Sequence, residues 1–409
     1  MHILFISHYF PPEVNAPANR TYEHARRWVA DGHQVTVITG VPNHPKGEIF
    51  PGYENRWIQE ENRDGIRVIR TWMYLGSSEN SITRSLNYIL FAFTVLYASF
   101  LAKNPDVVVA TTPQFFSGVA GLIVSRLKRR PFVLEVRDLW PDSIVQLLQL
   151  RRGILVRFLE TIERALYKST AGIVVNSRAF IDHIATFGVP KERIALIYNG
   201  VDPSLFQVRE RDPQLLQEYG LDGQFLVAYI GTLGMAHGLV TVLDAAELLR
   251  DLEDVVFVLI GDGADRVRLE QEIRERGLEN VRLLGLRPRS EIPRWLASID
   301  VSLVLLRDIP VLETVVPSKI FETLAEARPV LVAGRGEIRR MIEEAKAGFV
   351  IDPEVPDQLA RAIRYIRSHP EEAQARAQAG RDWVAANFQR DDLARAMARF
   401  LEEVANRAR

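Results

Sequence analysis

A short predicted helix and an apolar strand that follows it at once occupy the stretch Pro317-Ser318-Lys319-Ile320-Phe321-Glu322-Thr323-Leu324-Ala325-Glu326-Ala327-Arg328-Pro329-Val330-Leu331. Proline suits the first position of a helix, because its missing N–H would have no helical partner there. The open amides of a helix start attract an anion, and the helix dipole adds to that attraction. Lys319 adds a positive charge, and Glu322 lies three residues further on the same helix face. The stretch therefore fits a nucleoside diphosphate on a ribose, and the alternative is an ordinary helix start with a salt bridge.

The same alternation of strand and helix extends in both directions from this stretch. The predicted strands are short Val- and Ile-rich runs, often apolar at consecutive positions, which is typical of parallel strands buried on both faces. They lie at 2–7, 34–39, 66–71, 106–111, 132–136, 172–176 and 194–198, and again at 225–230, 255–260, 281–284, 300–305, 329–333 and 349–351. Helices are predicted between them, notably at 21–31, 153–168 and 179–187, with a last helix from about 391 to 405. A turn-rich junction near residues 200–220 separates the two series, so the pattern predicts two doubly wound α/β domains in tandem.

Length and composition agree with this division and exclude several classes of protein. The 409 residues are too many for one hydrophobic core, because cores stop growing at roughly 250–300 residues. Lys and Arg number 51 against 52 Asp and Glu, so no overall charge indicates a nucleic-acid partner. The chain has no cysteine, which excludes disulfides and cysteine zinc sites, and its eight histidines show no metal-ligand spacing. The first residues are typical of a strand rather than a signal peptide, so we expect a cytoplasmic protein.

Residues 85–102 form a segment without charge in which Leu, Ile, Phe and Val dominate. A membrane-spanning helix needs about 20 apolar residues, and this segment is slightly short for that. We expect first a helix that is buried on all faces, because such helices are apolar all round. A membrane-facing helix is the second interpretation, and a transmembrane span is the third.

The loops after the predicted strands hold the candidates for chemistry, because ligands of open α/β sheets bind outside the carboxyl ends of the strands. In the first half, the proline-rich loop 8–20 lacks the glycine fingerprint of a nicotinamide dinucleotide fold, and the loop 137–143 begins with a charged pair. In the second half, the glycines of 231–238 allow a backbone to approach phosphates closely. The turn 261–263 and the loop 286–289 follow the next two strands, and the latter could frame a base. The alternatives are a local ion pair with Trp140 as packing, a tight turn at 261–263, and a solvated His237.

Together these residues resemble the family 4 glycosyltransferases of the GT-B fold over nearly the whole chain. The resemblance includes the proline-rich first loop, the helix with Glu322, and the runs Val174-Val175-Asn176-Ser177, Tyr198-Asn199-Gly200-Val201-Asp202, Leu259-Ile260-Gly261-Asp262-Gly263 and Gly380-Arg381-Asp382-Trp383-Val384. Glu135-Val136-Arg137-Asp138-Leu139-Trp140-Pro141-Asp142 and Pro317-Ser318-Lys319-Ile320-Phe321-Glu322 look like the subgroup that builds bacterial surface polysaccharides. The N-acetyl-L-fucosaminyl transferases of O-antigen and capsule synthesis belong to that subgroup.

The resemblance implies an α/β architecture of two Rossmann-like doubly wound domains that face a central cleft, with a C-terminal helix that crosses back to the first domain. The expected domains are an acceptor-binding domain at 1–205, a nucleotide-sugar-binding domain at 206–385 and the returning helix at 386–409. The implied reaction is a retaining, metal-independent transfer, without a cofactor, from a nucleotide sugar such as a UDP-linked N-acetylated deoxysugar. The implied acceptor is a polyprenyl-diphosphate-linked saccharide of O-antigen, lipopolysaccharide or capsule synthesis. We expect a monomer or weak dimer that is peripheral at the inner face of the cell membrane, with no nucleic-acid partner.

The resemblance and the loop positions together assign the site residues. The catalytic candidates are Arg137, Asp138 and Lys319. The expected donor-binding residues are Gly231, Thr232, Leu233, Gly234, His237, Gly261, Gly263, Arg287, Thr314, Ser318, Lys319 and Glu322. The expected acceptor-binding residues are Pro12, Asn15, Asn19, Arg20 and Trp140. No metal ligand is expected.

The chain departs from the family's pattern at positions that matter for this assignment. The motif of two glutamates would place its first glutamate at 314, where this chain has Thr314. The diphosphate-binding arginine and lysine of the family correspond to Thr232 and His237, so Lys319 is the expected replacement. The usual histidine of the first domain is Arg137 here. A sugar-nucleotide 2-epimerase and a non-catalytic nucleotide-sugar-binding subunit remain alternatives.

Overall fold

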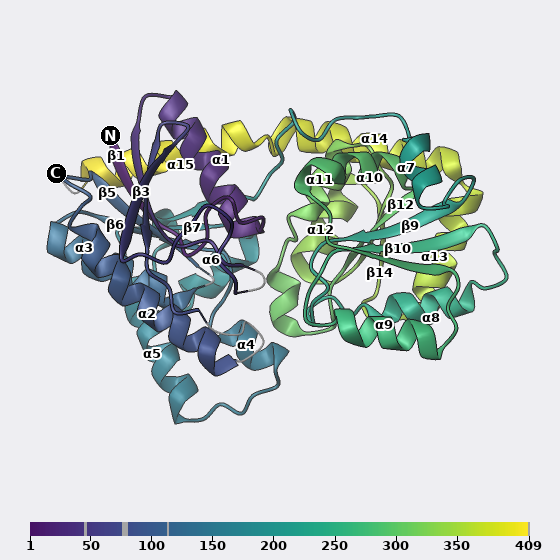
Figure 1. Ribbon diagram of the computed structural model, residues 1–409, viewed down its shortest axis with the longest axis horizontal. Helices are drawn as coiled ribbons and strands as arrows, with labels where there is room; N and C mark the ends of the chain where they lie inside the picture. The colour runs from purple at the N-terminus through teal and green to yellow at the C-terminus, as the bar shows by residue number, and fades with distance from the viewer. Residues whose placement is uncertain (45–46, 76–80, 113, 408–409) are drawn as a thin grey trace. The chain divides into compact units, whose positions relative to one another are not determined.

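The computed structural model describes residues 1–44, 47–75, 81–112 and 114–407. In the helix α2 Ser81–Ser99, side chains are described from Leu86 onward. The chain forms two compact units, Met1–Asn199 with Arg390–Arg409 and Gly200–Gln389. Each unit is built on a largely parallel sheet with helices on its two faces (Figure 1). The chain passes between the units at Asn199–Gly200 and at Gln389–Arg390, against expected boundaries at 205 and 385.

The sheet of the first unit has the order β3-β4-β2-β1-β5-β6-β7-β8. Its strands are β1 His2–Ile6, β2 Gln34–Gly40, β3 Ile58–Arg63, β4 Ile66–Thr71, β5 Val107–Thr111, β6 Phe132–Val136, β7 Gly172–Val175 and β8 Ile194–Leu196. The order reverses between β1 and β5, so the loops that follow these two strands diverge and leave room at the sheet edge. Every residue of β5 and β6 is buried, which agrees with the continuous apolar runs in the sequence.

Strand β3 was not predicted from the sequence. It pairs antiparallel with β4 at the edge of the sheet, and most of its residues are polar and partly exposed. An edge strand has only one neighbour and one covered face, so its sequence need not be apolar. The turn Asp64-Gly65, with φ of 52° and 80°, is the signal that could have found the hairpin.

The helices of the first unit include two that differ from expectation. They are α1 Ala16–Ala30, α2 Ser81–Ser99, α3 Phe115–Lys128, α4 Asp142–Leu147, α5 Ile154–Ser169, α6 Arg178–Ala185, the 3-10 turn η1 Lys191–Arg193 and α15 Arg390–Arg407. Helix α1 begins before residue 21 because the Asn15 side chain caps it and accepts a hydrogen bond from the Ala18 N–H at 2.9 Å.

Helix α2 contradicts the prediction of a helix that is buried on all faces. One side packs into the unit through Phe91, Val95 and Ala98, but Phe93 and Tyr97 on the other side are 64% and 62% exposed. Within the described ranges, no helix combines the length and the apolar character that crossing a membrane would require. The apolar composition of the segment therefore reflects two different surfaces, one of which faces outward.

Helix α15 returns to the first unit and completes its core. The Trp28 indole N–H donates to the Ala394 carbonyl at 2.8 Å, and Met397, Leu401 and Val404 are buried among strand residues. Figure 1 shows α15, in yellow, beside α1, in purple. The expected C-terminal helix that crosses back to the first domain is thus confirmed.

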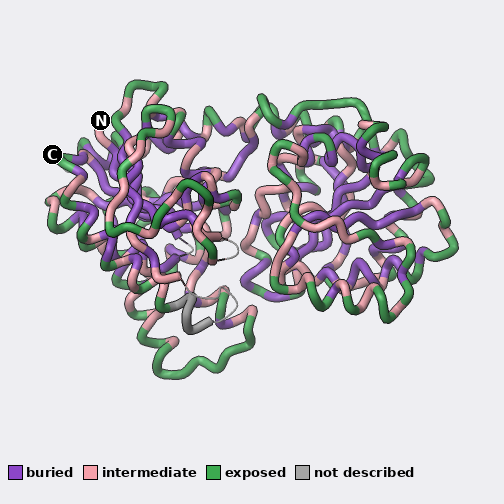
Figure 2. The backbone as a smooth tube through the Cα atoms, viewed as in Figure 1, coloured by how far each residue is buried: buried purple, intermediate pink, exposed green. Residues whose placement is uncertain are grey.

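The second unit repeats the architecture in the order β11-β10-β9-β12-β13-β14, with all pairs parallel. Its strands are β9 Phe225–Ile230, β10 Val255–Ile260, β11 Val281–Gly285, β12 Val301–Leu305, β13 Val330–Ala333 and β14 Phe349–Ile351. Its helices and turns are α7 Pro213–Glu218, α8 Val240–Leu248, α9 Arg266–Glu275, η2 Arg289–Glu291, α10 Ile292–Ser298, η3 Pro310–Thr314, α11 Lys319–Ala325, α12 Gly336–Ala345, α13 Pro356–Ser368 and α14 Pro370–Asn387. Figure 2 shows the strands as the buried layer of this unit. The strand order reverses between β9 and β12.

The packing of α15 can be tested with Leu401→Ala. Leu401 is fully buried in the core of the first unit, so we expect the variant to lose about 2–5 kcal/mol of unfolding free energy. Urea unfolding followed by tryptophan fluorescence measures the loss. Arg399→Ala, at an exposed position of the same helix, is the matched control and should change the unfolding free energy by less than about 0.5 kcal/mol. Equal effects of the two substitutions would show that α15 does not contribute to the core.

Candidate functional site

The candidate residues form two clusters, one in each unit, beyond the carboxyl ends of the parallel strands. In the second unit the loops after β9, β10 and β11 carry most of the expected donor-binding residues, and the start of α11 lies beside them. In the first unit the loops after β1 and β6 carry the expected catalytic arginine and the acceptor-binding residues. Each cluster includes the loop after a strand at which the order reverses, β1 in the first unit and β9 in the second. Open α/β sheets bind ligands at such positions.

Glycines press the loops after β9 and β10 against each other. A Cβ atom at Gly261 would lie 1.8 Å from the Gly231 carbonyl oxygen, and one at Gly263 would lie 2.3 Å from the Leu233 carbonyl oxygen. All three glycines have φ between 145° and 159°, a region that other residues rarely adopt. The glycines at 261 and 263 therefore permit contact between two loops, which explains them without a direct contact to phosphate.

Lys319 reaches from α11 to the loop after β9. Its Nζ lies 3.5 Å from the centroid of the Tyr229 ring, and a Cβ atom at Gly231 would lie 2.8 Å from the same nitrogen. The nitrogen is buried, and it has no hydrogen-bond partner among the described residues. A buried ammonium group normally finds an acceptor, so this one is placed for an anion over the glycine loop.

The protonation states of the groups around Lys319 are compatible with the binding of a negatively charged ligand. Burial lowers the pKa of Lys319 to about 7, against the opposing effect of Glu322. Burial, and then the charge of Lys319, lowers the pKa of His237 to about 4, so His237 is neutral at pH 7. The His237 Nδ1 lies 3.0 Å from the Leu305 carbonyl oxygen, which the ring N–H can donate to. His237 is thus a half-buried part of the loop packing and not a solvated residue.

Glu322 follows Lys319 by one helical turn in α11. Burial raises its pKa, while Arg289 and Lys319 oppose the shift. A carboxylate in this position can accept hydrogen bonds from the hydroxyls of a ribose or sugar.

The helix start itself differs from expectation. Helix α11 begins at Lys319 with Ser318 as its cap residue, so Pro317 precedes the helix and does not occupy its first position. The helix has seven residues, and the Ser318 side chain forms no capping hydrogen bond. The anion site therefore depends on the Lys319 ammonium group more than on the helix end, because the amides of such a short helix contribute a small dipole.

The remaining expected donor-binding residues differ in how far their polar groups are already hydrogen-bonded within the protein. The Thr232 carbonyl accepts a hydrogen bond from the Tyr229 hydroxyl at 2.8 Å, and the Thr314 hydroxyl donates to the Val311 carbonyl at 2.6 Å. Leu233 is buried in the core, and the Gly234 carbonyl accepts from the His237 N–H at 3.0 Å. Arg287 stacks 5.0 Å above the Tyr219 ring centroid, and its Nε has no hydrogen-bond partner among the described residues. Tyr229, which the sequence analysis did not single out, is the platform of the Lys319 side chain.

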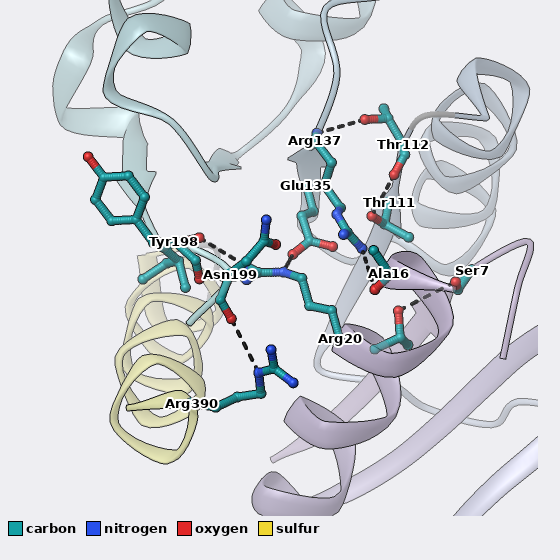
Figure 3. A network of polar contacts seen from close by, with 12 residues as sticks. Ser7, Ala16, Arg20, Thr111, Thr112, Glu135, Arg137, Tyr198, Asn199 and Arg390 are labelled. Atoms are coloured by element: carbon teal, nitrogen blue, oxygen red, sulfur yellow. Dashed lines mark hydrogen bonds and ion pairs between the residues drawn. The ribbon is translucent and has the colours of Figure 1, made fainter. Parts of the chain in front are cut away.

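In the first unit, Arg20 is the centre of a buried network (Figure 3). Its Nε donates to Glu135 at 2.7 Å, and its two terminal nitrogens donate to the Tyr198 and Ile197 carbonyls at 2.6 and 3.0 Å. Arg20 is only 2% exposed, so its guanidinium group ties α1, β6 and the end of β8 together. This geometry supports a positioning role for Arg20 in place of the expected contact to an acceptor.

Arg390 extends the network to the second passage of the chain. It forms an ion pair with Glu23, and its Nε donates to the Asn199 carbonyl at 3.2 Å. Arg20, which belongs to α1, and Arg390, at the start of α15, thereby bind the carbonyl groups of Tyr198 and Asn199, where the chain leaves the first unit (Figure 3).

Glu135 was missed by the sequence analysis although it lies in the quoted run before Arg137. Burial opposes its ionisation, but Arg20, Arg137, Thr111 and His24 outweigh burial and lower its pKa to about 2. A carboxylate inside an otherwise apolar strand, two residues before an arginine, is the signal that could have found it.

Arg137 and Asp138 lie together at the carboxyl end of β6. The Arg137 backbone N–H donates to the Thr112 hydroxyl oxygen at 2.8 Å, and the Arg137 Nη1 donates weakly to the Ala16 carbonyl at 3.5 Å. Its Nε has no hydrogen-bond partner among the described residues, and burial lowers its pKa to about 10. Burial also raises the pKa of Asp138, with Arg137 opposing the shift. The pair therefore offers a cation and a carboxylate at one strand end.

The other expected acceptor residues line the start of α1 and the loop after β6. Asn15 caps α1 and keeps an unpartnered Nδ2 among the described residues, and Asn19 is half-buried one turn later. Pro12 is half-buried within the loop after β1. Trp140 stacks on Phe115 with ring centroids 4.5 Å apart, which supports its packing role.

Glu13 organises this loop and was also missed. Its carboxylate accepts hydrogen bonds from the backbone N–H groups of Asn43, His44 and Phe10 at 3.1, 3.0 and 3.3 Å. It is 1% exposed, and burial raises its pKa to about 7. The carboxylate therefore joins the loop after β1 to the loop after β2. In the described ranges no group of three or more His, Cys, Asp and Glu side chains is placed to hold a metal ion.

Comparison with known proteins identifies the two units. The family Glycosyl transferase 4-like domain matches residues 15–200, and the family Glycosyl transferases group 1 matches residues 212–383. The putative colanic acid biosynthesis glycosyl transferase WcaI of Escherichia coli K12 is 25% identical over 375 residues, covering 89% of this chain and 91% of that protein. The amylovoran biosynthesis glycosyltransferase AmsK of Erwinia amylovora is 24% identical, covering 56% of this chain and 55% of that protein.

A solved structure shows the same fold. The crystal structure of Anabaena Alr3699/HepE in complex with UDP superposes with a TM-score of 0.70 at 20% identity, covering 98% of this chain and 100% of that one. The similarity and the two sheets confirm the expected fold of two Rossmann-like α/β domains.

The contact between the loops after β9 and β10 predicts a strong effect of Gly261→Ala. The added Cβ would clash with the Gly231 carbonyl, so we expect a loss of about 3 kcal/mol or more in the stability of the second unit. Gly277→Ala is the matched control, because Gly277 has a positive φ but open space around it and should lose only about 1–2 kcal/mol. Thermal unfolding measures both. If the two variants unfold alike, the loops are not pressed together by these glycines.

The Arg20–Glu135 ion pair predicts a pH dependence of stability in acid. The pKa of Glu135 falls from 4.5 to about 2 on folding, so its contribution is fully present above pH 4.5 and is lost as the pH falls to 2. This difference corresponds to about 3 kcal/mol. Glu135→Gln should therefore be less stable than the wild type at pH 6 but should lose less stability between pH 4.5 and 2.

Acid titration of the unfolding free energy, with Glu192→Gln as control, tests this pair. Glu192 is exposed in the same unit, so its substitution should leave the pH profile of the wild type unchanged. A Glu135→Gln profile that runs parallel to the wild-type profile would mean that Glu135 is not the group responsible.

Proposed function

We propose that this chain, which belongs to the glycosyltransferases of the GT-B fold, transfers a sugar from a nucleotide sugar to a saccharide acceptor of a bacterial surface polysaccharide. The observation that carries the proposal is the buried Lys319 ammonium group without a hydrogen-bond partner among the described residues, aimed at the glycine loop of the unit that matches Glycosyl transferases group 1. Relatives named for colanic acid and amylovoran biosynthesis support the polysaccharide product.

The donor in this proposal is a UDP-sugar, with an N-acetylated deoxysugar as the favoured class. The UDP complex of the Anabaena protein with the same fold supports this choice of nucleotide. Lys319 and the backbone of 231–238 bind the diphosphate, and Glu322 accepts hydrogen bonds from the ribose hydroxyls. Arg287, over Tyr219, lies in the loop after β11, where it can contact the base.

The proposed chemistry is a retaining transfer. The bond between carbon 1 of the sugar and the oxygen of the β-phosphate breaks, and its electron pair stays on that oxygen. The acceptor hydroxyl oxygen forms the new bond on the same face of the sugar, and its proton passes to the departing phosphate. Lys319 stabilises the negative charge that develops on the diphosphate, and such preorganised charge stabilisation is commonly the main source of rate acceleration in enzymes. No enzymic nucleophile and no metal ion take part in this proposal.

The proposed acceptor binds the first unit and is linked to a lipid through a diphosphate. In this proposal the substrate contacts Arg137, whose Nε is unpartnered among the described residues, and Asp138, both at the end of β6. We assign Arg137 to an anionic part of the substrates and Asp138 to a hydroxyl. A lipid-linked acceptor requires the protein to work at a membrane surface as a peripheral protein.

Substitutions of Lys319 test the proposal. Lys319→Ala removes the ammonium group, so we expect turnover with a UDP-sugar to fall by about a hundredfold or more. Lys346→Ala, at the other lysine of the second unit, is exposed and should retain wild-type turnover. The substrate is found first by thermal-shift screening of UDP-, GDP- and dTDP-sugars, and the product is identified by mass spectrometry. Wild-type affinity and turnover in Lys319→Ala would contradict the assignment.

The pH dependence of UDP binding gives the same prediction a second readout. Lys319 loses its proton as the pH rises through about 7 in the free protein. UDP affinity should then fall by up to about tenfold per pH unit above that point. Lys319→Arg keeps its charge over this range, so its UDP affinity should not decline, and calorimetric titration from pH 6 to 9 compares the two. His237 is neutral throughout this range and does not contribute.

The competing functions have distinct outcomes in the same preparations. A 2-epimerase would incorporate deuterium at carbon 2 of a UDP-sugar in deuterated water, without transfer. A non-catalytic binding subunit would show thermal stabilisation by the nucleotide sugar but neither transfer nor hydrolysis.

A further inference from the structure

Helix α2 exposes a continuous apolar stripe where a surface helix normally exposes polar side chains. The exposed residues from Leu86 onward are Leu86, Ile89, Phe93, Tyr97 and, just after the helix, Phe100. Their spacing of three or four residues places them on one face of the helix. Phe100 is 70% exposed, so this face remains uncovered in the isolated chain.

Two neighbouring helices extend the apolar face. Helix α2 packs against α3, and α3 packs against α5, in the layer of the sheet opposite to α1 and α15 (Figure 1). Ile123 and Leu127 are exposed on α3. Ile154, at the start of α5, is 88% exposed, and Leu155 and Phe158 are exposed beside it. An apolar surface that spans several elements marks an interaction site rather than the scattered exposure of ordinary surfaces.

Basic residues outnumber acidic residues on this layer, and α5 holds Arg157, Arg164 and Lys168 against Glu160 and Glu163. Helices α2 and α3 contain no acidic residue. At the end of α3, a pocket of about 430 Å³ is lined by Arg126, Arg129 and Arg130, together with Ser169 and Thr170 from the end of α5. In the part of the chain that the structure describes, none of these three guanidinium groups forms an ion pair or a hydrogen bond.

The arrangement of the arginines goes beyond the ordinary function of basic residues at a helix end. Lys128 joins the end of α3 to the chain after α2, because its Nζ donates to the Ala102 carbonyl at 2.7 Å. The three arginines instead surround an open pocket whose size admits a phosphate group, the anion that guanidinium groups bind in bidentate fashion. Arg126 follows Ile123 by three residues, so the pocket adjoins the apolar face.

We propose that the outward face of α2, α3 and α5 is a docking surface for an anionic lipid membrane, and that the arginine pocket receives a lipid phosphate. Apolar side chains that enter the headgroup region and basic side chains that meet anionic lipid are the two attractions that hold interfacial helices. A second copy of the chain fits this face less well, because a symmetric contact would bring two positive surfaces together. The docking surface is argued from exposure and charge alone. It rests on the proposed function only for its purpose, which is to bring the protein to a lipid-linked acceptor.

Sedimentation of the protein with vesicles tests the surface. We expect binding to vesicles of phosphatidylcholine and phosphatidylglycerol in equal amounts, and at least about tenfold weaker binding to phosphatidylcholine alone. The preference should disappear when NaCl is raised from about 0.1 M to about 1 M, because salt screens exposed charges. Protein that stays in the supernatant with anionic vesicles at low salt would overturn the proposal.

The apolar stripe is tested by Phe93→Gln combined with Tyr97→Gln and Phe100→Gln. The three side chains are exposed, so the variant should fold normally, which circular dichroism and thermal unfolding check. Vesicle binding should fall by at least about tenfold. Leu248→Gln combined with Val267→Gln, at exposed apolar positions of the second unit, is the matched control and should bind as the wild type does. An unchanged stripe variant would overturn the assignment of this face.

The pocket is tested by Arg126→Gln combined with Arg129→Gln and Arg130→Gln. Binding to anionic vesicles should fall by about tenfold or more, and binding to phosphatidylcholine should not change. Arg274→Gln combined with Arg361→Gln and Arg381→Gln removes the same charge from exposed positions of the second unit and should leave binding unaffected. Equal losses in the two sets would mean that only net charge matters, which would overturn the pocket.

Two further measurements separate the possible sources of phosphate and the possible partners. In the first, millimolar inorganic phosphate would stabilise the wild type but not the pocket variant, while both bind vesicles equally. That result would assign the pocket to a soluble phosphate and overturn the proposal of a lipid phosphate. In the second, sedimentation velocity would show concentration-dependent dimers of the wild type that the stripe variant does not form. If the wild type also fails to bind vesicles, the face belongs to a contact with a second copy of the chain. Thermal stabilisation by UDP should be equal in all four variants. Vesicle binding without any sugar transfer would leave this surface intact and would reject the proposed function alone.

Discussion

Burial of parallel strands on both faces is the constraint on which both units depend. Every residue of β5, β6 and β10 is buried, so these strands need helices on each side and crossovers that return to the same end of the sheet. The carboxyl ends of the strands consequently meet at one edge. Arg137 directly follows β6 in the first unit and Gly231 directly follows β9 in the second, so each lies at that edge of its own sheet.

Polar groups buried beside this edge have opposite functions in the two units. In the first unit Arg20 is saturated by Glu135 and two carbonyl groups, so it stabilises the points where the chain crosses between units. In the second unit the Lys319 nitrogen is buried over the Tyr229 ring and has no hydrogen-bond partner among the described residues. The first arrangement is complete without a ligand, whereas the second gains its partner when an anion binds. A residue type and a strand-end position do not distinguish these cases, because the difference lies in which acceptors reach the cation.

The outer helices show how composition can mislead. An uncharged segment suggested a helix that is buried all round, yet α2 buries one side and exposes Phe93, Tyr97 and Phe100 on the other. A one-dimensional sequence records that all sides of a helix are apolar but not how many sides the protein covers. The arginines that line the pocket at the end of α3 give the uncovered side its proposed partner.

The sequence by itself determined the fold class, most strand positions, the two-unit order and the loops that carry the glycines, because local periodicity and turn residues report these features directly. Its resemblance to a known family also indicated the transferase function. Only the tertiary structure decided what individual side chains contact. Arg20 changed from an expected acceptor contact to a buried anchor, Gly261 and Gly263 became contacts between loops, and Glu135, Glu13 and Tyr229 emerged as partners. The physical reason is that these contacts join residues far apart in the chain, and distance along the chain does not reveal which of them meet at a sheet edge.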